Sequence, residues 1–317
     1  MNSPLEIFRA NERRLHGIAY RMLASRADAE DMVQETYVRW HRADVDAILA
    51  PQAWLSTTIT HLCIDRLRAL RTEREAYVGP WLPEPHEGAA APPADAASEF
   101  ASDLSMAFLL VLQRLAPEER AAFLLHDVFD NSYADVALVL DRSEAACRQL
   151  VSRARRRVRR ERPRYQVSEE ARIRLLERFV EALGAQDQVA LLAILAPVAV
   201  WTSDGGGKAT AARKVVRGNR GVARLLLGAW RHALVRFAPA LATINGEPGL
   251  VFRDRGTTVA TVSIVTDGMH VLAGLAVVNP DKLKYFVPCD ARALNVAAPK
   301  SAPTRSASRA GEGPRSR

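Results

Sequence analysis

The segment from Ser132 to Arg160, SYADVALVLDRSEAACRQLVSRARRRVRR, most constrains the fold of this chain. Apolar residues recur at helical spacing in its first half, and Asp141 and Arg142 then interrupt the pattern. Ser143 is a residue type that favours the N-cap of a new helix. The inward stripe of this second helix comprises Cys147, Leu150, Val151, Ala154 and Val158. Its outer faces carry Arg148, Gln149, Ser152, Arg153, Arg156 and Arg159. This layout predicts a DNA-binding helix-turn-helix, and the alternative is a solvated basic helix end.

Charge is unevenly distributed along the 317 residues, which together carry a net charge of +8. Ten arginines stand against three acidic residues between Asp141 and Arg164, whereas the segment Asp28 to Glu35 is locally acidic. This asymmetry predicts one surface for nucleic acid and another for a different partner.

Other site classes find little support in the sequence. Cys63, Cys147 and Cys289 lie far apart and form no CxxC or His/Cys cluster, so we expect no disulfide framework, metal or cofactor. Residues 1–14 are polar and charged, unlike a signal peptide. The longest apolar run, Val189 to Val200, is too short to span a bilayer and contains Pro197. We therefore expect a cytoplasmic protein without a membrane segment.

The pattern divides the chain into several domains. We expect an all-α domain at 1–76, a Pro-rich linker at 77–98, an all-α helix-turn-helix domain at 99–164 and an α+β domain at 168–287. The helices of the α+β domain are expected at 168–187 and 220–232, and its strands at 198–202, 235–245, 250–253, 258–265 and 270–278. These strands predict a curved antiparallel sheet. The Ala-, Pro-, Ser- and Arg-rich residues 288–317 predict a disordered basic tail.

Two motifs in register carry a family resemblance. DAEDMVQETYVRWHR, starting at Asp28, and APQAWLSTTITHLCIDRLRAL, starting at Ala50, closely resemble region 2 of the sigma-70 family. The match is to its extracytoplasmic-function sigma factors. The segment from Glu99 to Arg160, with LAPEERAAFLLHDVFDNSYADVA, resembles region 4 of the same family.

Three further motifs resemble a subgroup of these sigma factors that carries a SnoaL-like (NTF2-like) C-terminal domain. They are YVGPWLPEP at 77–85, DGGGK at 204–208 and NPDKL at 279–283. The resemblance then covers roughly residues 5–286, and it implies a cone-shaped α+β fold for the third domain.

The resemblance implies two partners for the first domain. The acidic helix would dock on the β′ clamp of core RNA polymerase, with the β flap as a second polymerase contact of the protein. Its contact residues would be Asp28, Asp31, Gln34, Glu35 and Arg39. The following helix would face the melted −10 strand, where aromatic and polar side chains capture unstacked bases. Its candidates are Trp54, Thr57, Thr58, His61, Asp65 and Arg68. Trp54 fits a core position even better than a base contact.

The base preference at the −10 element does not carry over, because many family members have Asn and Arg where this chain has His61 and Leu62. In the second domain, Arg148 and Gln149 are the candidates for reading base edges of the −35 element, because Arg pairs bidentately with guanine and Gln with adenine. Ser143, Ser152 and Arg153 are expected to contact phosphates.

The third domain is expected to regulate the sigma domains in cis by binding the linker. Stiff aromatic and proline segments bind grooves at a modest ordering cost. The residues assigned to this contact are Trp81, Pro83, Pro85, Asp204, Gly205, Gly206, Gly207, Lys208, Asn279, Pro280 and Asp281. By itself the glycine loop fits a docking element, an anion site or a simple turn. Whether this domain binds a ligand is unknown.

Three functions therefore compete. The first is a sigma factor that binds core RNA polymerase and directs −10/−35 recognition. The second is a helix-turn-helix repressor with a ligand-binding C-terminal domain, which would not need the acidic surface. The third is a polyketide-cyclase-like enzyme with a DNA-binding appendage. An enzyme would use Asp204 or His270, but the sequence contains no paired constellation, so we predict no catalytic residues. The two sigma-like motifs favour the first function.

Overall fold

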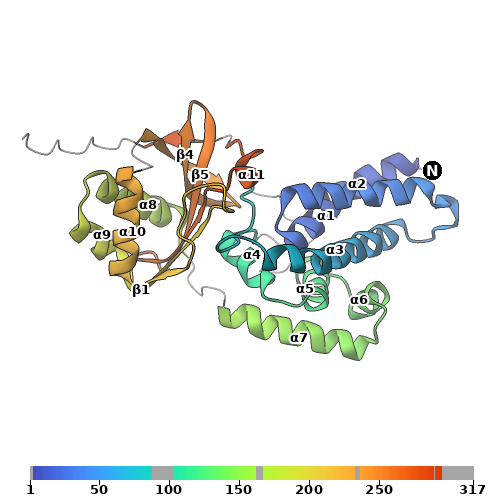
Figure 1. Ribbon diagram of the computed structural model, residues 1–317. Coiled ribbons are helices and arrows are strands. Elements are labelled where there is room, and N and C mark those ends of the chain that lie inside the picture. The colour runs from blue at the N-terminus through green and yellow to red at the C-terminus, as the bar shows by residue number, and fades with distance from the viewer. Residues whose placement is uncertain (1–2, 88–102, 162–166, 233–235, 289, 295–317) are drawn as a thin grey trace, which may run out of the picture.

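The computed structural model describes residues 3–87, 103–161, 167–232, 236–288 and 290–294. Figure 1 shows two blocks side by side, an α-helical block formed by the first half of the chain and an α+β block formed by the second. No helix within the described ranges is long and apolar enough to cross a membrane.

Three long helices form the first helical group. They are α1 (Pro4–Leu23), α2 (Arg26–Arg42) and α3 (Pro51–Glu75), with the short 3-10 turn η1 (Val45–Ala47) before α3. Ser3 and Glu6 form a capping box at the start of α1, and Ala24 ends this helix in the left-handed conformation. Ser25 then caps α2, so two residues suffice to reverse the chain.

The second helical group contains the predicted helix-turn-helix. It consists of α4 (Met106–Gln113), α5 (Pro117–Phe123), the π-helical turn η2 (Leu124–Val128), α6 (Tyr133–Leu140) and α7 (Glu144–Glu161). A capping box between Ser132 and Asp135 starts α6, and Asp141 ends it with a positive φ of 51°. The Oγ of Ser143 accepts a hydrogen bond from the Ala146 amide at 3.2 Å, which starts α7 as predicted.

The α+β block begins with two helices, α8 (Glu169–Gly184) and α9 (Gln188–Ile194). Its remaining elements are β1 (Leu195–Asp204), β2 (Val216–Arg217), α10 (Asn219–His232), β3 (Ala238–Ile244), β4 (Glu247–Asp254), β5 (Thr257–Thr266), β6 (Val271–Val277), α11 (Pro280–Leu283) and β7 (Arg292–Ala293). Within the described residues the strands form one sheet in the order β2-β1-β6-β5-β4-β3-β7.

The sheet departs from the expected antiparallel arrangement at one pair, because β1 runs parallel to β6. Strands β3 to β6 follow one another through short turns and are therefore antiparallel. A long connection through α10 separates β1 from β3. Because no short hairpin joins β1 to β3, the direction of β1 is not fixed by a turn. The prediction of an α+β domain is confirmed, and the sheet is mixed. The prediction of a disordered tail at 288–317 is wrong at its start, because residues 292–293 form β7 and pair with β3. The part of this tail from 295 onward and the linker residues 88–98 lie outside the described residues.

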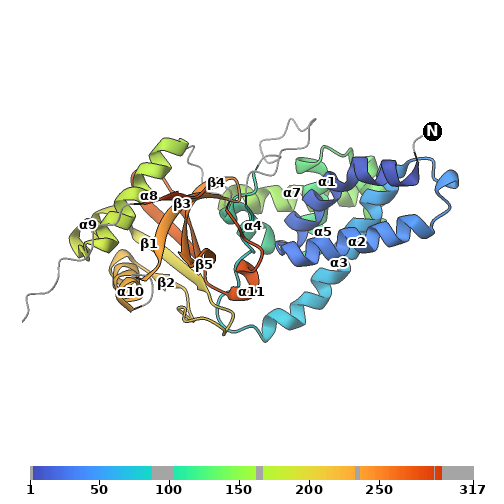
Figure 2. The same cartoon turned by 90° about the horizontal axis from the view of Figure 1, so that it is seen from above.

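The two faces of the sheet have different neighbours. α8, α9 and α10 cover one face, where Phe179, Trp201, Trp230 and Phe252 fill the domain core. On the other face Leu82 of the linker is buried with Met106 of α4, Leu275 of β6 and Leu283 of α11. Seen from above, α4 and α11 lie between the sheet and the helices α1, α2 and α5 (Figure 2). The linker and the second helical group thus pack against the outer face of the sheet.

Candidate promoter, polymerase and interdomain interfaces

The predicted polymerase-binding residues lie along α2, but they are not equally available. Asp31, Gln34 and Arg39 are exposed. Asp28 forms an ion pair with Arg66 of α3 at 2.8 Å, and its side chain is only 17% exposed. Glu35 pairs with Arg39 at 2.9 Å one turn away. Asp28 therefore joins α2 to α3, and the exposed remainder forms the accessible polar surface.

The predicted −10 residues on α3 form two groups. Trp54 is half-buried against Trp40, with ring centroids 5.5 Å apart, which agrees with its assignment to the core. The hydroxyls of Thr57 and Thr58 donate hydrogen bonds to backbone carbonyls of the same helix, those of Ala53 and Trp54. These three residues occupy the first two turns of α3.

The second group of −10 candidates meets the second helical group. His61 Nε2 lies 2.6 Å from the carbonyl oxygen of Val139 in α6, and Arg68 lies 3.3 Å from Glu118 in α5. Asp65 pairs with Arg68 at 3.1 Å. The two helical groups therefore pack together through α3, and residues from both contribute to one buried apolar cluster.

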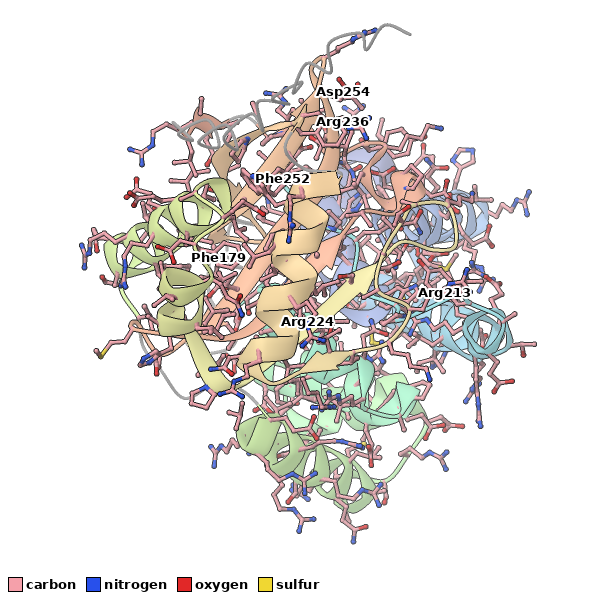
Figure 3. The ribbon with its side chains drawn as sticks, turned by 60° about the vertical axis from the view of Figure 1, so that its left-hand side comes forward. Phe179, Arg213, Arg224, Arg236, Phe252 and Asp254 are labelled. Carbon is pink, nitrogen blue, oxygen red and sulfur yellow. The ribbon has the colours of Figure 1, made fainter. Side chains whose placement is uncertain are left out.

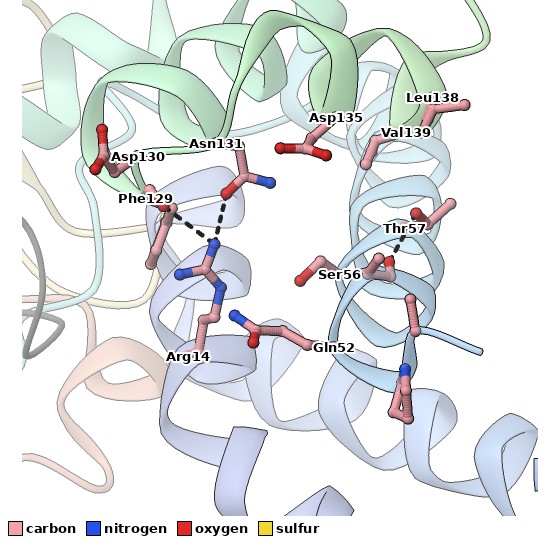
Figure 4. A pocket seen from close by; sticks show the side chains of 13 residues that line it. Arg14, Gln52, Ser56, Thr57, Phe129, Asp130, Asn131, Asp135, Leu138 and Val139 are labelled. Carbon is pink, nitrogen blue, oxygen red and sulfur yellow. Dashed lines mark hydrogen bonds between the residues drawn. The ribbon is translucent and has the colours of Figure 1, made fainter. Parts of the chain in front are cut away.

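A cavity of about 540 Å³ lies where α1 and α3 meet the segment from η2 to α6. In Figure 4 Arg14 donates hydrogen bonds to the Phe129 carbonyl and to Asn131, and Gln52 of α3 lies on the same side of the cavity, whereas Thr57 lies on the far side near Val139. The −10 candidate Thr57 thus lines a space that the second helical group also encloses.

Arginines bind the end of α1 across this junction. Arg120 of α5 is 2% exposed and donates to the carbonyl of Met22. Arg74 of α3 donates to the Leu23 carbonyl at 3.4 Å and to the side chain of Gln113. Burial lowers the pKa of Arg120 to about 9. The last carbonyls of a helix are unpaired and carry its negative dipole end, so they suit buried cations.

The outer face of α7 is exposed at Arg148, Gln149, Ser152 and Arg153. Arg148 pairs with Glu144 at 2.6 Å and lies 5.0 Å from the centre of the Tyr133 ring, whereas Arg153 pairs with Glu119 at 3.0 Å. Ser143 is also exposed, although its hydroxyl already serves as the N-cap. The inward stripe predicted for this helix is buried throughout.

Asp204, at the end of β1, is the centre of the contact between linker and third domain. It is fully buried, and its two carboxylate oxygens accept hydrogen bonds from the Tyr77 hydroxyl at 2.5 Å and the Leu82 amide at 2.8 Å. Lys282 of α11 pairs with the same carboxylate at 2.7 Å and donates to the Leu82 carbonyl. The burial of Tyr77, together with its bond to Asp204, raises the pKa of the Tyr77 hydroxyl.

Two cations stack on Trp81, Arg74 from α3 and Lys282 from α11 of the third domain. Lys282 Nζ lies 3.8 Å and Arg74 Cζ 4.0 Å from the centre of the indole ring. Burial lowers the pKa of the Lys282 ammonium to about 8, although the Asp204 carboxylate raises it. Pro83 and Pro85 are buried beyond this point. The linker is therefore held by aromatic, apolar and charged contacts together.

The three glycines after Asp204 allow the loop to approach the linker closely. Gly206 has a φ of +57°, and a Cβ there would lie 2.3 Å from Asn279 Nδ2. Gly207 has a φ of +74° and faces Val78. A Cβ at Gly205 would lie 2.5 Å from the Ala209 carbonyl oxygen. Of the possibilities left open by the sequence, this geometry is that of a docking loop.

The NPDKL motif completes the same contact. Asn279 donates to the Tyr77 hydroxyl at 2.8 Å and caps α11, which Pro280 begins. Asp281 forms an exposed ion pair with Lys208 of the glycine loop at 2.5 Å. The structure thus brings together the DGGGK, NPDKL and linker motifs, which are far apart in the sequence.

The structure adds residues that the predicted site set omitted. Three of them are Tyr77, Glu84 and Lys282. They lie within the linker and NPDKL motifs, so the sequence could have indicated them as site residues. Glu84 binds the start of α2 through the Ser25 hydroxyl at 2.9 Å and the Arg26 amide at 2.6 Å. Burial raises the pKa of this carboxyl, and those two hydrogen bonds oppose the shift.

Two further residues connect all three parts of the chain. The Tyr20 hydroxyl of α1 donates to the Glu84 carbonyl at 2.7 Å and accepts from Asn245 at 2.7 Å. Asn245, in the turn between β3 and β4 with a φ of 54°, also accepts from the His86 amide at 3.0 Å. No sequence pattern marked Tyr20 or Asn245, because their roles arise only from the tertiary contact.

The groups considered for an enzyme are separated. Asp204 is occupied by the linker contact. His270 lies in the turn after β5, where its amide and ring face Asp267. The two residues therefore do not form an acid–base pair.

The comparisons with known proteins agree with the geometry. Residues 7–73 match the model of Sigma-70 region 2, and residues 105–158 match that of Sigma-70, region 4. The chain belongs to the extracytoplasmic-function sigma factors of the sigma-70 family. A sigma factor is not an enzyme, and it binds core RNA polymerase and promoter DNA.

Among its relatives, the ECF RNA polymerase sigma factor SigJ of Mycobacterium tuberculosis is 38% identical over 292 residues, which cover 87% of this chain and 91% of SigJ. The probable ECF RNA polymerase sigma factor SigI of the same species is 32% identical, over 86% of this chain and 94% of SigI. The crystal structure of SigJ matches with a TM-score of 0.67 and 36% identity, covering 87% of this chain and 97% of that structure. The chain is therefore SigJ-like over its helical regions and its α+β domain.

Proposed function

We propose that this sigma factor contacts core polymerase through Asp31, Gln34 and Arg39 on α2 and reads the −35 element through Arg148 and Gln149 on α7. One observation supports the DNA contact: α7 exposes a polar face to solvent, while its apolar stripe is buried on the opposite side. Arg153 and Ser152 flank these residues and fit phosphate contacts. Thr57, Thr58, His61 and Arg68 would face the melted −10 strand from α3.

Promoter binding requires the helical regions to separate. Elements centred about 25 base pairs apart lie about 85 Å apart along straight B-form DNA. In the structure α3 touches α5 and α6 directly, through Arg68 with Glu118 and His61 with Val139. This closed arrangement cannot span the two elements at once, so His61 and Arg68 become available for DNA only when the contact opens.

In this proposal the third domain controls this opening in cis. Its sheet buries Leu82 of the linker together with Met106 of α4, and Asp204 binds both Tyr77 and the Leu82 amide. Because the linker must rearrange when the helical regions separate, each of these contacts stabilises the closed form relative to the open one. A domain that holds the linker thereby raises the free-energy cost of promoter binding.

Transcription in vitro tests both parts. Core polymerase is supplied at limiting concentration with a genomic DNA library. Transcripts are sequenced for the full-length protein, a chain ending at Val167 and the variants D204N, D281N and R148A/Q149A. We expect R148A/Q149A to lose promoter-specific start sites and D204N to raise transcript yield several-fold. D281N, which breaks only an exposed ion pair, serves as the matched control.

The outcomes separate the two parts of the proposal. If both D204N and the truncated chain transcribe with the yield of the full-length protein, cis regulation is wrong. If R148A/Q149A keeps the start sites of the wild type, the assignment of the −35 contact is wrong. Core binding measured by co-purification with a D31A/Q34A/R39A variant tests the α2 surface independently.

A further inference from the structure

A basic stretch in the third domain has no part in the contacts described so far. Residues 205–246 contain eight lysines and arginines and no aspartate or glutamate. One of the eight, Lys208, pairs with Asp281. The other seven are Arg213, Lys214, Arg217, Arg220, Arg224, Arg231 and Arg236, all of them exposed.

The fold aligns three of these cations on α10. At about 100° per residue, Arg220, Arg224 and Arg231 fall within about 40° of one another around the helix. The opposite side of α10 is buried in the domain core through Val222, Leu226 and Trp230 among others. Arg220, Arg224 and Arg231 therefore form a stripe that faces solvent, called the α10 stripe below.

The cations before α10 extend this surface. Arg213 and Lys214 lie in the connection between β1 and β2, and Arg217 ends β2, directly before α10. In the view of Figure 3, α10 lies in front, with Arg224 on the helix and Arg213 to one side of it. Arg236 lies near Asp254 at the far end, so the surface is least basic there.

Within the described ranges none of these seven side chains forms an ion pair, whereas Arg148, Arg153 and Arg155 of α7 each pair with a carboxylate. A cluster of unpaired exposed cations creates a positive potential that attracts phosphates. The α10 stripe is thus a stronger candidate for a sequence-independent phosphate contact than much of α7.

The chain connection favours DNA as the source of those phosphates. α7 ends at Glu161, and the N-cap of α8 is Ser168, seven residues later. Seven residues span at most about 25 Å when fully extended. Whenever α7 occupies the −35 major groove, the third domain is therefore tethered beside the same duplex at a high effective concentration.

We propose that the α10 stripe binds the phosphate backbone of promoter DNA flanking the −35 element, as a third DNA contact of this sigma factor. The stripe adds affinity without base specificity, because arginines that contact phosphates recognise charge and do not read base edges. This inference rests on DNA binding by α7 and is independent of cis regulation through Asp204.

The test compares two full-length triple variants that lose the same charge. R220Q/R224Q/R231Q removes the α10 stripe, and R174Q/R178Q/R255Q removes three exposed cations of the same domain that lie among acidic residues such as Glu170 and Asp254. Binding to a fluorescent 30-base-pair duplex of random sequence is measured by anisotropy between 50 and 200 mM KCl. Near-UV circular dichroism checks that both variants keep the native packing.

We expect the stripe variant to bind at least ten-fold more weakly at 100 mM KCl, and the salt slope to fall by about 2 to 3, since each phosphate contact contributes about 0.9. The control variant should change affinity less than two-fold. Equal losses in both variants would reduce the effect to net charge and overturn the proposal. So would unchanged DNA binding, including the case in which the stripe variant instead loses binding to core polymerase. R148A/Q149A, measured in parallel on the same duplex, reports separately on α7.

Discussion

The two interfaces that close this molecule differ in chemistry. The first and second helical groups meet through a continuous apolar cluster, supplemented by Arg120 and Arg74 on the carbonyls of α1. The linker and the third domain meet through a buried carboxylate, Asp204, with Lys282, Tyr77 and the Leu82 amide around it. Apolar packing adapts to small displacements, whereas a buried polar network loses much of its stability when one member is removed. The comparison indicates that the first interface holds the two helical groups together by apolar burial, and that the second fixes the position of the linker.

The largest effect is expected from D204A, which leaves Lys282 buried without its partner. Removing one member of a buried ion pair costs about 3–5 kcal/mol. We expect hydrogen exchange of the Leu82 amide to accelerate by about 10² or more. Mass spectrometry of peptides from 77–87 measures this rate. D281A, which breaks an exposed pair worth about 0–1 kcal/mol, should leave it nearly unchanged.

R120A tests the apolar interface in the same way. The substitution removes a charged hydrogen bond to Met22, and we expect a loss of about 2–3 kcal/mol. Hydrogen exchange should accelerate in the last turn of α1 and in α5, with less effect at Leu82. R114A, which breaks an exposed pair with Glu161, is the control. If R120A released Leu82 as strongly as D204A does, the two interfaces would form one cooperative unit and the contrast between them would fail.

G206A tests the geometric demand of the glycine loop. The new Cβ would meet Asn279 in a backbone conformation with positive φ, and we expect a cost of about 2 kcal/mol. G218A has a φ of +82° but no atom within 4 Å of its Cβ, so it should show only the backbone cost of about 1 kcal/mol. Urea unfolding of both variants measures the difference. Equal losses would mean that the close approach of Gly206 to Asn279 contributes nothing.

The smallest effect concerns pH. The pKa of Lys282 is lowered to about 8 in the folded protein from an ordinary value of 10.5. Between these values the unfolded chain binds the extra proton, so this group makes stability rise with pH, by at most about 1.4 kcal/mol per unit. Tyr77 opposes the trend at higher pH, because its pKa is raised. The free energy of unfolding of wild type and of K282M, measured between pH 7.5 and 9.5, isolates the contribution of the lysine. Identical slopes of this free energy against pH would contradict the burial of Lys282 as a cation.

Much of the fold followed from local patterns. The cap at Ser143 and the inward stripe of α7 specified the helix-turn-helix, since both depend on residues within a few turns. The parallel pairing of β1 with β6 was missed because no local pattern reports the direction of a strand after a long connection. The motif residues Asp204 and Gly206 were predicted at the interdomain site, but Tyr20 and Asn245 were not, because their hydrogen bond joins residues 225 positions apart. The −10 residues stay a prediction, and in this structure His61 and Arg68 contact the second helical group, which no local pattern indicated.

The bond between Glu84 and the start of α2 links the linker to the helix proposed to meet polymerase. A carboxylate at a helix N-terminus stabilises the first turn, so departure of the linker removes a cap from α2 as well as freeing the two helical regions. Any factor by which linker release changes the affinity of α2 for polymerase must, by thermodynamic reciprocity, be the factor by which bound polymerase changes linker release. The enzyme that this subunit serves would then be an allosteric effector of its own specificity factor.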